Sequence, residues 1–283
     1  MLILSNRGEL SLPDRKQTRG FWDNDKFNSE VMLKISATNA WMPFPYKDAS
    51  SLRTVFGGHA LFIFGGYNQK NKGWDDAALD AARVVDSTLL EMRANVGRVA
   101  GLWPCRGQNV LETIEFAIAR KNASTSAAQF APCVSALLSA GVAVSLMGHS
   151  CGGYIAYLIA ARSIGRRLRN VVLMNAAMRQ SEWDPSVAIA AEQWLCFHST
   201  EDKALRTMQL DFIDEAGSNG FWGGILNVFR GKNKVDEPIV GMHGIPQVAL
   251  NIENVDVTED IGGDHSAARY VPDVMDKVAG LFQ

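Results

Sequence analysis

The chain of 283 residues has no long hydrophobic run. None of its apolar stretches approaches the roughly 18 residues that a membrane-spanning helix needs. The apolar patch before Ser5 is too short for the core of a signal peptide, and no cleavage site follows it. We therefore expect no membrane span and a cytoplasmic protein.

Cysteine is scarce, and its spacing matches neither a disulfide framework nor a metal site. The four cysteines are Cys105, Cys133, Cys151 and Cys196. Their positions show no paired or metal-type spacing. We expect free thiols in a reducing compartment and no bound metal.

An excess of charge of one sign is also missing, because the formal net charge is only −2. The one basic run, residues 162–170, fits the solvated end of a helix. Binding to nucleic acid needs a concentrated basic face. We therefore expect no nucleic-acid partner.

Linkers rich in proline, glycine or serine are absent, as are repeats and low-complexity segments, so residues 1–283 are expected to form a single domain. Short apolar runs predict strands at residues 29–37, 59–66, 97–104, 142–148, 170–177, 193–199 and 253–258. Helical spacing predicts helices at residues 74–95, 107–121, 126–141, 151–162, 203–217 and 264–282. This alternation predicts an α/β fold with a mostly parallel central sheet and helices on both faces. Residues 1–28 are weakly patterned, and we expect an antiparallel edge or an N-terminal extension there.

A serine stands where one predicted strand turns directly into a helix. The segment Gly148-His149-Ser150-Cys151-Gly152 separates the apolar run VAVSLM from the helical run GGYIAYLIAAR. A sharp strand–turn–helix lifts the serine hydroxyl clear of the sheet, and flanking glycines remove the Cβ atoms that would clash there. The pattern predicts a nucleophilic Ser150. A structural glycine turn is the alternative.

A serine hydroxyl needs a base, and the chain has five histidines. His265 lies in a glycine-containing loop after the last predicted strand, where a base can reach the serine, and His243 in another loop is the alternative. His59 opens a strand and His198 ends one. His149 is inside the turn, and we expect its side chain to point away from the site.

The histidine in turn needs an acid that orients it and stabilises its charged form. Asp202 follows the predicted strand at 193–199 and is the preferred candidate, with Glu201 beside it and Asp184 after the preceding strand as alternatives. Asp202 is also placed to cap the helix that follows. The resulting chain order is Ser150, Asp202, His265, which is the order of one of the three known arrangements of such a triad.

The negatively charged oxygen of an acyl-transfer intermediate needs two hydrogen-bond donors. The backbone N–H of Cys151, directly after the serine, is one candidate. The second is the backbone N–H of Tyr67, because Gly65 and Gly66 before it allow a close approach of the main chain. A plain glycine turn is again the alternative.

These residues resemble the α/β-hydrolase superfamily. GHSCGG is similar to its GHSxGG elbow, and FIFGGYN is similar to the HGYN oxyanion loop of a bacterial esterase/lipase-like branch, whose GLWP strand is matched too. The resemblance runs from about Ser29 to the C-terminus and implies the α/β-hydrolase fold. Gly65 stands where many relatives have a histidine that orders the loop, so we expect a looser loop here.

The expected function is therefore hydrolysis of a carboxylic ester through an acyl-enzyme, with no cofactor. The substrate would be a small or lipid-like acyl compound. Acyl transfer, thioester hydrolysis or amide hydrolysis by the same triad is one alternative, and a non-catalytic binding protein on the same fold is another. Residues 206–250 form a candidate flap insertion, since residues 217–234 are rich in aromatic and aliphatic side chains; ordinary surface packing is the alternative.

Overall fold

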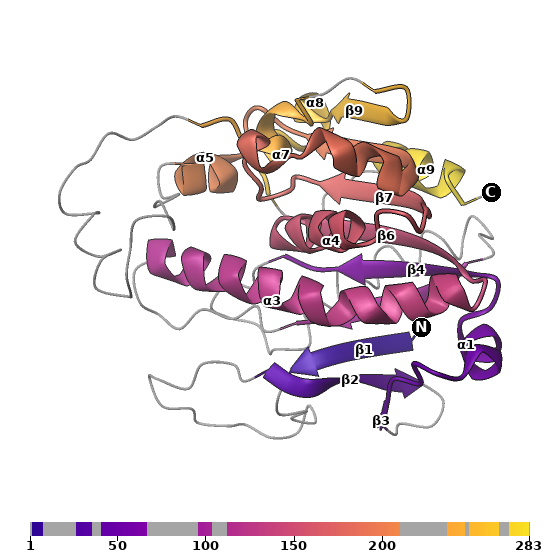
Figure 1. The fold of residues 1–283 in the computed structure, drawn as a ribbon. Helices are drawn as coiled ribbons and strands as arrows, with labels where there is room; N and C mark the ends of the chain where they lie inside the picture. The colour runs from indigo at the N-terminus through magenta and orange to yellow at the C-terminus, as the bar shows by residue number, and fades with distance from the viewer. Residues whose placement is uncertain are drawn as a thin grey trace.

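The computed structural model describes residues 2–7, 27–35, 41–66, 96–103, 112–209, 237–246, 249–265 and 272–282. Within these ranges one nine-stranded sheet has the order β3-β2-β1-β5-β4-β6-β7-β8-β9 (Figure 1). The strands are β1 (Leu2–Arg7), β2 (Phe27–Ile35), β3 (Trp41–Pro43), β4 (His59–Phe64), β5 (Gly97–Leu102), β6 (Ala143–His149), β7 (Leu168–Met174), β8 (Ala191–His198) and β9 (Ile252–Asp256). The helices are α1 (Ala49–Phe56), α3 (Glu112–Ser139), α4 (Cys151–Arg162), η1 (Gln180–Glu182), η2 (Pro185–Ala190), α5 (Lys203–Gln209), α7 (Val240–His243), α8 (Thr258–Ile261) and α9 (Pro272–Gly280).

The sheet is mostly parallel. Every neighbouring pair from β1 through β5, β4, β6, β7 and β8 to β9 is parallel, whereas β2 is antiparallel to both β1 and β3. Parallel strands need crossover connections, and α3 and α4 supply two of them. The α/β fold that the sequence predicts is confirmed.

The N-terminal strand lies further inside the sheet than the sequence suggests. We expected residues 1–28 to form an antiparallel edge or an extension. Strand β1 does pair antiparallel with β2, but its other side pairs in parallel with β5, and β3 forms the edge. The edge assignment is thus wrong for residues 2–7, because side-chain pattern does not reveal which two neighbours a strand binds.

Successive side chains along the buried strands point to opposite faces of the sheet, so the core is divided into two clusters. In β4, Phe62 and Phe64 pack in the larger cluster with residues of α3 and α4. Leu61 and Ile63 point the other way, into the smaller cluster with residues of α9. Figure 1 shows α3 and α4 crossing the front of the sheet. Because both faces are covered, these strands read as continuous apolar runs.

Helix α3 joins two segments that the sequence suggests are separate. It runs from Glu112 to Ser139 and continues through Pro132. A buried stripe explains its continuity, because one face stays apolar across the polar segment at residues 122–126. Its members are Ala119, Ala123, Ala127, Phe130, Val134 and Leu137. The helix expected at residues 74–95 lies outside the described residues.

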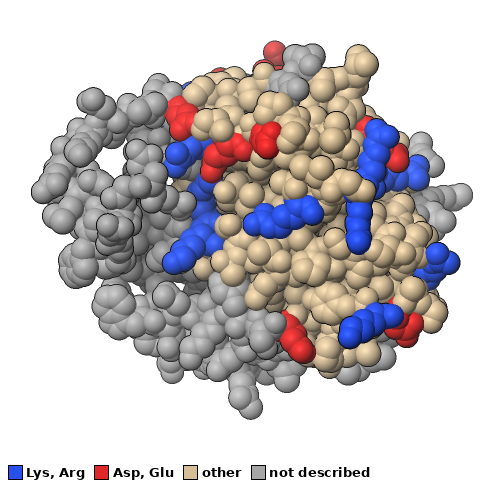
Figure 2. Space-filling model, viewed as in Figure 1, with Lys and Arg blue, Asp and Glu red and all other residues tan. Residues whose placement is uncertain are grey.

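The helices of the described residues and the charges on one face of the molecule can be compared with the expectations for membrane and nucleic-acid binding. Among the described residues, no helix is both long and apolar enough to cross a bilayer. On the face in Figure 2, the described Lys and Arg side chains are scattered, and Asp and Glu side chains lie beside several of them. A phosphate backbone would have no concentrated positive field to bind on the described part of this face.

Candidate active site

Ser150 occupies a strained turn between β6 and α4. Its φ of 55° and ψ of −123° are unusual for a residue with a side chain. The turn is tightly packed: a Cβ on Gly148 would lie 2.1 Å from the carbonyl oxygen of Gly152, and one on Gly152 would lie 2.2 Å from that of Phe64. Both glycines are therefore sterically required. The turn also holds the buried Ser150 by a 3.0 Å bond from its N–H to the Met174 carbonyl.

Asp202 and His265 meet across 63 residues of sequence. His265 Nδ1 lies 2.6 Å from Asp202 Oδ2, which requires that Nδ1 carry the proton when the carboxylate is ionised. Asp202 follows β8 and is fully buried, and His265 follows α8 after two glycines. This places the proton-accepting lone pair of a neutral His265 on Nε2. Nε2 is buried and has no hydrogen-bond partner among the described residues, Ser150 included.

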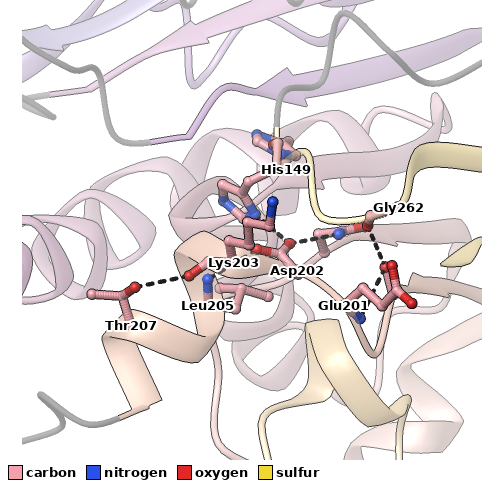
Figure 3. A network of polar contacts seen from close by, with 10 residues as sticks. His149, Glu201, Asp202, Lys203, Leu205, Thr207 and Gly262 are labelled. Carbon is pink, nitrogen blue, oxygen red and sulfur yellow. Dashed lines mark hydrogen bonds and ion pairs between the residues drawn. The ribbon is translucent and has the colours of Figure 1, made fainter.

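Asp202 accepts three hydrogen bonds. Its Oδ2 binds His265 and also the amide of Asn175 at 2.7 Å, and its Oδ1 binds the N–H of Leu205 at 2.9 Å. Burial by itself raises the pKa of this carboxyl group, but the contacts with His265, Leu205 and Asn175 lower the pKa more, and the net shift is downward. Asp202 therefore stays ionised while it both caps α5 and binds the imidazole (Figure 3).

Asn175 is a site residue that sequence reasoning missed. It follows β7 as Ser150 follows β6, is fully buried, and has a left-handed φ of 43°. Asparagine tolerates this conformation better than most residues. Little in the sequence pointed to it, because Asn175 lies inside the strand that we expected at residues 170–177, whereas the observed strand ends at Met174.

His149 does not point away from the site, contrary to expectation. Its Nε2 lies 2.7 Å from the carbonyl oxygen of His265, and the two imidazole rings are 4.7 Å apart between centroids. Loss of hydration, followed by the charge of His265, lowers the pKa of His149 to about 3. His149 is therefore a neutral neighbour of the candidate base.

The loop at Gly65 and Gly66 lies against the serine turn. A Cβ on Gly66 would be 2.9 Å from the Ser150 Cβ and 3.0 Å from His149 Nδ1. The indole N–H of the buried Trp103 donates to the Gly65 carbonyl at 3.0 Å. Trp103 thus holds the main chain at Gly65. Tyr67, the expected donor, lies outside the described residues.

Cys151, the other expected donor, is at the start of a helix. Cys151 is the first residue of α4, and the N–H groups of the first helical turn are directed out of the helix end. Its thiol is buried and forms no disulfide, as is true of Cys133 and Cys196, while Cys105 lies outside the described residues.

The alternative acid and base candidates are exposed or lie at the other end of the sheet. His243 and Glu201 are exposed, and Asp184 is exposed at the start of η2, where it accepts from the Ser186 N–H. His59, at the opposite end of the sheet, is bonded to Ser145. Most of the candidate flap, including residues 217–234, lies outside the described residues.

His198, the remaining histidine, ends β8 opposite Asp256 of β9. Within the described part of the chain, no group of three or more His, Cys, Asp or Glu side chains could hold a metal ion. The described residues thus offer the chemistry of a serine, a histidine and an aspartate.

No family model and no curated protein sequence matches this chain. Solved structures that resemble it include TT1662 from Thermus thermophilus, which is 13% identical in sequence. That match covers 79% of this chain and 87% of TT1662, with a TM-score of 0.40. EstE1, a thermostable carboxylesterase cloned from a metagenomic library, matches at 12% identity, 89% of this chain, 85% of that chain and a TM-score of 0.38. Esterase B from Lactobacillus rhamnosis matches at 10% identity, 85% of this chain, 80% of that chain and a TM-score of 0.37. Likenesses at these values assign no activity to this chain.

Proposed function

We propose that this protein is a serine hydrolase that cleaves a carboxylic ester through an acyl-enzyme, with Ser150 as nucleophile, His265 as base and Asp202 as acid. The observation that carries the proposal is the 2.6 Å contact between the buried Asp202 and His265, beside a serine on a strained turn. Strained turns of this kind persist where function requires them.

Acylation begins when Ser150 Oγ attacks the ester carbonyl carbon. The hydroxyl proton passes to His265 Nε2 as the Oγ–C bond forms, and the carbonyl π electrons move onto oxygen. This step requires Ser150 Oγ and Nε2 to form a hydrogen bond that they do not make in this structure. The C–O bond to the alcohol then breaks, and the alcohol leaves with the proton from Nε2. Asp202 stabilises the imidazolium through Nδ1.

Deacylation repeats these steps with water as the nucleophile. His265 Nε2 takes a proton from water as its oxygen attacks the acyl carbon, and then returns the proton to Ser150 Oγ as the acid is released. The oxyanion in both halves would be held by the N–H groups of Cys151 and Tyr67. The closeness of Gly66 to Ser150, where an added Cβ would lie 2.9 Å from the Ser150 Cβ, supports a donor from the loop that begins at Gly65.

Initial rates with nitrophenyl esters of two to sixteen acyl carbons, together with labelling by a fluorophosphonate probe, test the proposal. We expect measurable ester hydrolysis and a single labelled residue, Ser150, identified by mass spectrometry. Ser150→Ala should lose turnover on the order of 10⁶-fold, and Asp202→Ala should lose less. Ser150→Ala with full esterase activity would overturn the mechanism.

The acceptor and the leaving group depend on the pocket rather than on the triad. Labelling at Ser150 without ester hydrolysis at any chain length would therefore overturn the ester assignment and favour thioester, amide or acyl-transfer chemistry. Absence of both labelling and hydrolysis in folded protein would overturn the enzyme assignment and favour the binding protein.

A further inference from the structure

His149 joins the serine turn to the loop that carries the candidate base. It is the last residue of β6 and directly precedes Ser150. Its imidazole reaches across 116 residues of sequence to the main-chain carbonyl of His265, with Nε2 and oxygen 2.7 Å apart. Figure 3 includes His149 in the same network of contacts as Asp202.

The chemistry of this contact assigns the proton. A carbonyl oxygen only accepts hydrogen bonds, so His149 Nε2 must carry the hydrogen. Burial keeps the ring neutral, since it lowers the pKa of His149 to about 3. Nε2 is then the protonated nitrogen of a neutral imidazole, and the ring acts as a fixed donor across the ordinary pH range.

The loop before His265 is held from a different side. Ser199 Oγ donates to the Gly262 carbonyl at 2.8 Å, and the Lys203 N–H donates to the Gly263 carbonyl at 3.3 Å. The first contact comes from the turn after β8 and the second from the first residue of α5. They fix the start of the loop relative to Asp202, whereas the His149 bond fixes the His265 main chain relative to Ser150.

We propose that His149 is a positioning residue: its Nε2–H holds the His265 main chain so that the imidazole of His265 stays within reach of Ser150 Oγ. This inference rests on the proposed function, because it gives His149 a role in the same proton transfer. Gly66 lies beside the ring, because a Cβ added to it would be 3.0 Å from His149 Nδ1. A displacement of about 1 Å at such a site can lower the rate about 100-fold.

The neutrality of His149 matters for the same step. The His265 ring becomes positively charged when it accepts the serine proton, and its centroid lies 4.7 Å from that of His149. A second cation at this distance would disfavour the imidazolium. A neutral ring supplies the hydrogen bond without that repulsion.

Two substitutions separate the hydrogen bond from the ring contact. His149→Phe keeps an aromatic ring beside His265 but removes the donor, and His149→Gln removes the ring but keeps an N–H donor at a similar reach. We expect the Phe variant to lose about 10–100-fold in kcat with KM unchanged. The Gln variant should stay within about threefold of the wild type. His59→Phe, at the far end of the sheet, is the matched control and should leave kcat unchanged.

The rate of fluorophosphonate labelling at Ser150 is the second readout, since it requires the base but not the natural substrate. It should fall in the Phe variant and recover in the Gln variant, with folding checked by thermal melting. If the Phe variant unfolds, the smaller His149→Leu replaces it. Wild-type kcat and labelling in the donor-free variant, or equal losses in the Gln and donor-free variants, would overturn the positioning role.

The two proposals fail separately. An active Ser150→Ala protein would overturn the proposed function itself. An inactive Ser150→Ala protein beside a fully active His149→Phe protein would overturn only the role of His149.

Discussion

Asn175 Nδ2 donates to Asp202 Oδ2 at 2.7 Å, the same oxygen that His265 Nδ1 meets at 2.6 Å. Asn175 directly follows β7, and His265 lies in the loop after α8, beyond β9. Asn175 and Asp202 are fully buried. Asn175 therefore restricts the carboxylate to the plane in which it can receive the imidazole.

Asn175→Gly should lower kcat about 10-fold, because glycine accepts the left-handed backbone but cannot hold Asp202. Loss of this donor should also raise the pKa of Asp202 toward its ordinary value of 3.8. A carboxyl group whose pKa is lower in the folded than in the unfolded chain stabilises the fold at every pH above its unfolded pKa. This stabilisation is lost as the pH falls through the pKa of the folded state. The acid-unfolding midpoint of the variant should thus move to higher pH.

Asn170→Gly is the matched control for that substitution. Asn170 lies in β7, the strand that ends just before Asn175; it is also buried, and it donates to the Leu281 carbonyl away from the site. It should lose stability, by about 1–3 kcal/mol, with kcat unchanged. Equal kcat values for wild type and Asn175→Gly would show that Asp202 is oriented without Asn175.

Gly66→Ala should lower kcat/KM about 100-fold, since the new methyl group meets Ser150 Cβ and His149 Nδ1 at 2.9 and 3.0 Å. The serine turn is held by main-chain bonds, so the glycine loop is the part that must move. Gly58→Ala is the control, because a Cβ there has no neighbour within 4 Å. Steady-state kinetics of the two variants test this, and an unaffected Gly66→Ala protein would contradict the loop's assignment to the site.

Trp103→Phe should lower kcat and also destabilise the fold by about 1–3 kcal/mol, because the Gly65 carbonyl loses its indole donor. Trp194→Phe removes the same type of bond from an equally buried tryptophan, where the Ala188 carbonyl keeps its bond from Asn251. That variant should melt lower with an unchanged kcat. Matching kinetic losses in both variants would mean that the effect is general destabilisation.

Stability should fall as the solution is acidified from pH 6.5 to about 4. Burial lowers the pKa of His149 to about 3 and that of His59 to about 4, from an ordinary 6.5. Between these values the unfolded chain binds more protons than the folded one, so acid favours unfolding. The pH dependence of the unfolding free energy, measured by urea titration across this range, gives the number of protons taken up on unfolding. This number should be about one lower in His149→Gln than in the wild type, and about one lower in His59→Gln. An unchanged pH slope in His149→Gln would show that this ring is not held neutral.

The strand–turn–helix at Ser150 follows from local sequence. A continuous apolar run predicts a strand covered on both faces, and the following helical run with glycines at the turn leaves little choice of conformation. Parallel strands bring their carboxyl ends to one edge, which is why the sequence favoured Asp202 and His265 as candidates, with Glu201, Asp184 and His243 as alternatives. The merging of two expected helices into α3 shows the limit of this reasoning, because buried alanines carry the helix through a polar segment.

By itself, the sequence determined seven of the nine strands of the described sheet, its mostly parallel character and the residue types at its carboxyl edge, because these depend on periodicity over a few residues. Tertiary structure alone decided which histidine meets Asp202, and it placed β1 between β2 and β5. It also turned His149 toward His265 and set Asn175 and Trp103 behind the site. The physical reason is that these contacts join residues 27 to 116 positions apart, and directional hydrogen bonds between such residues leave no periodic trace in the sequence.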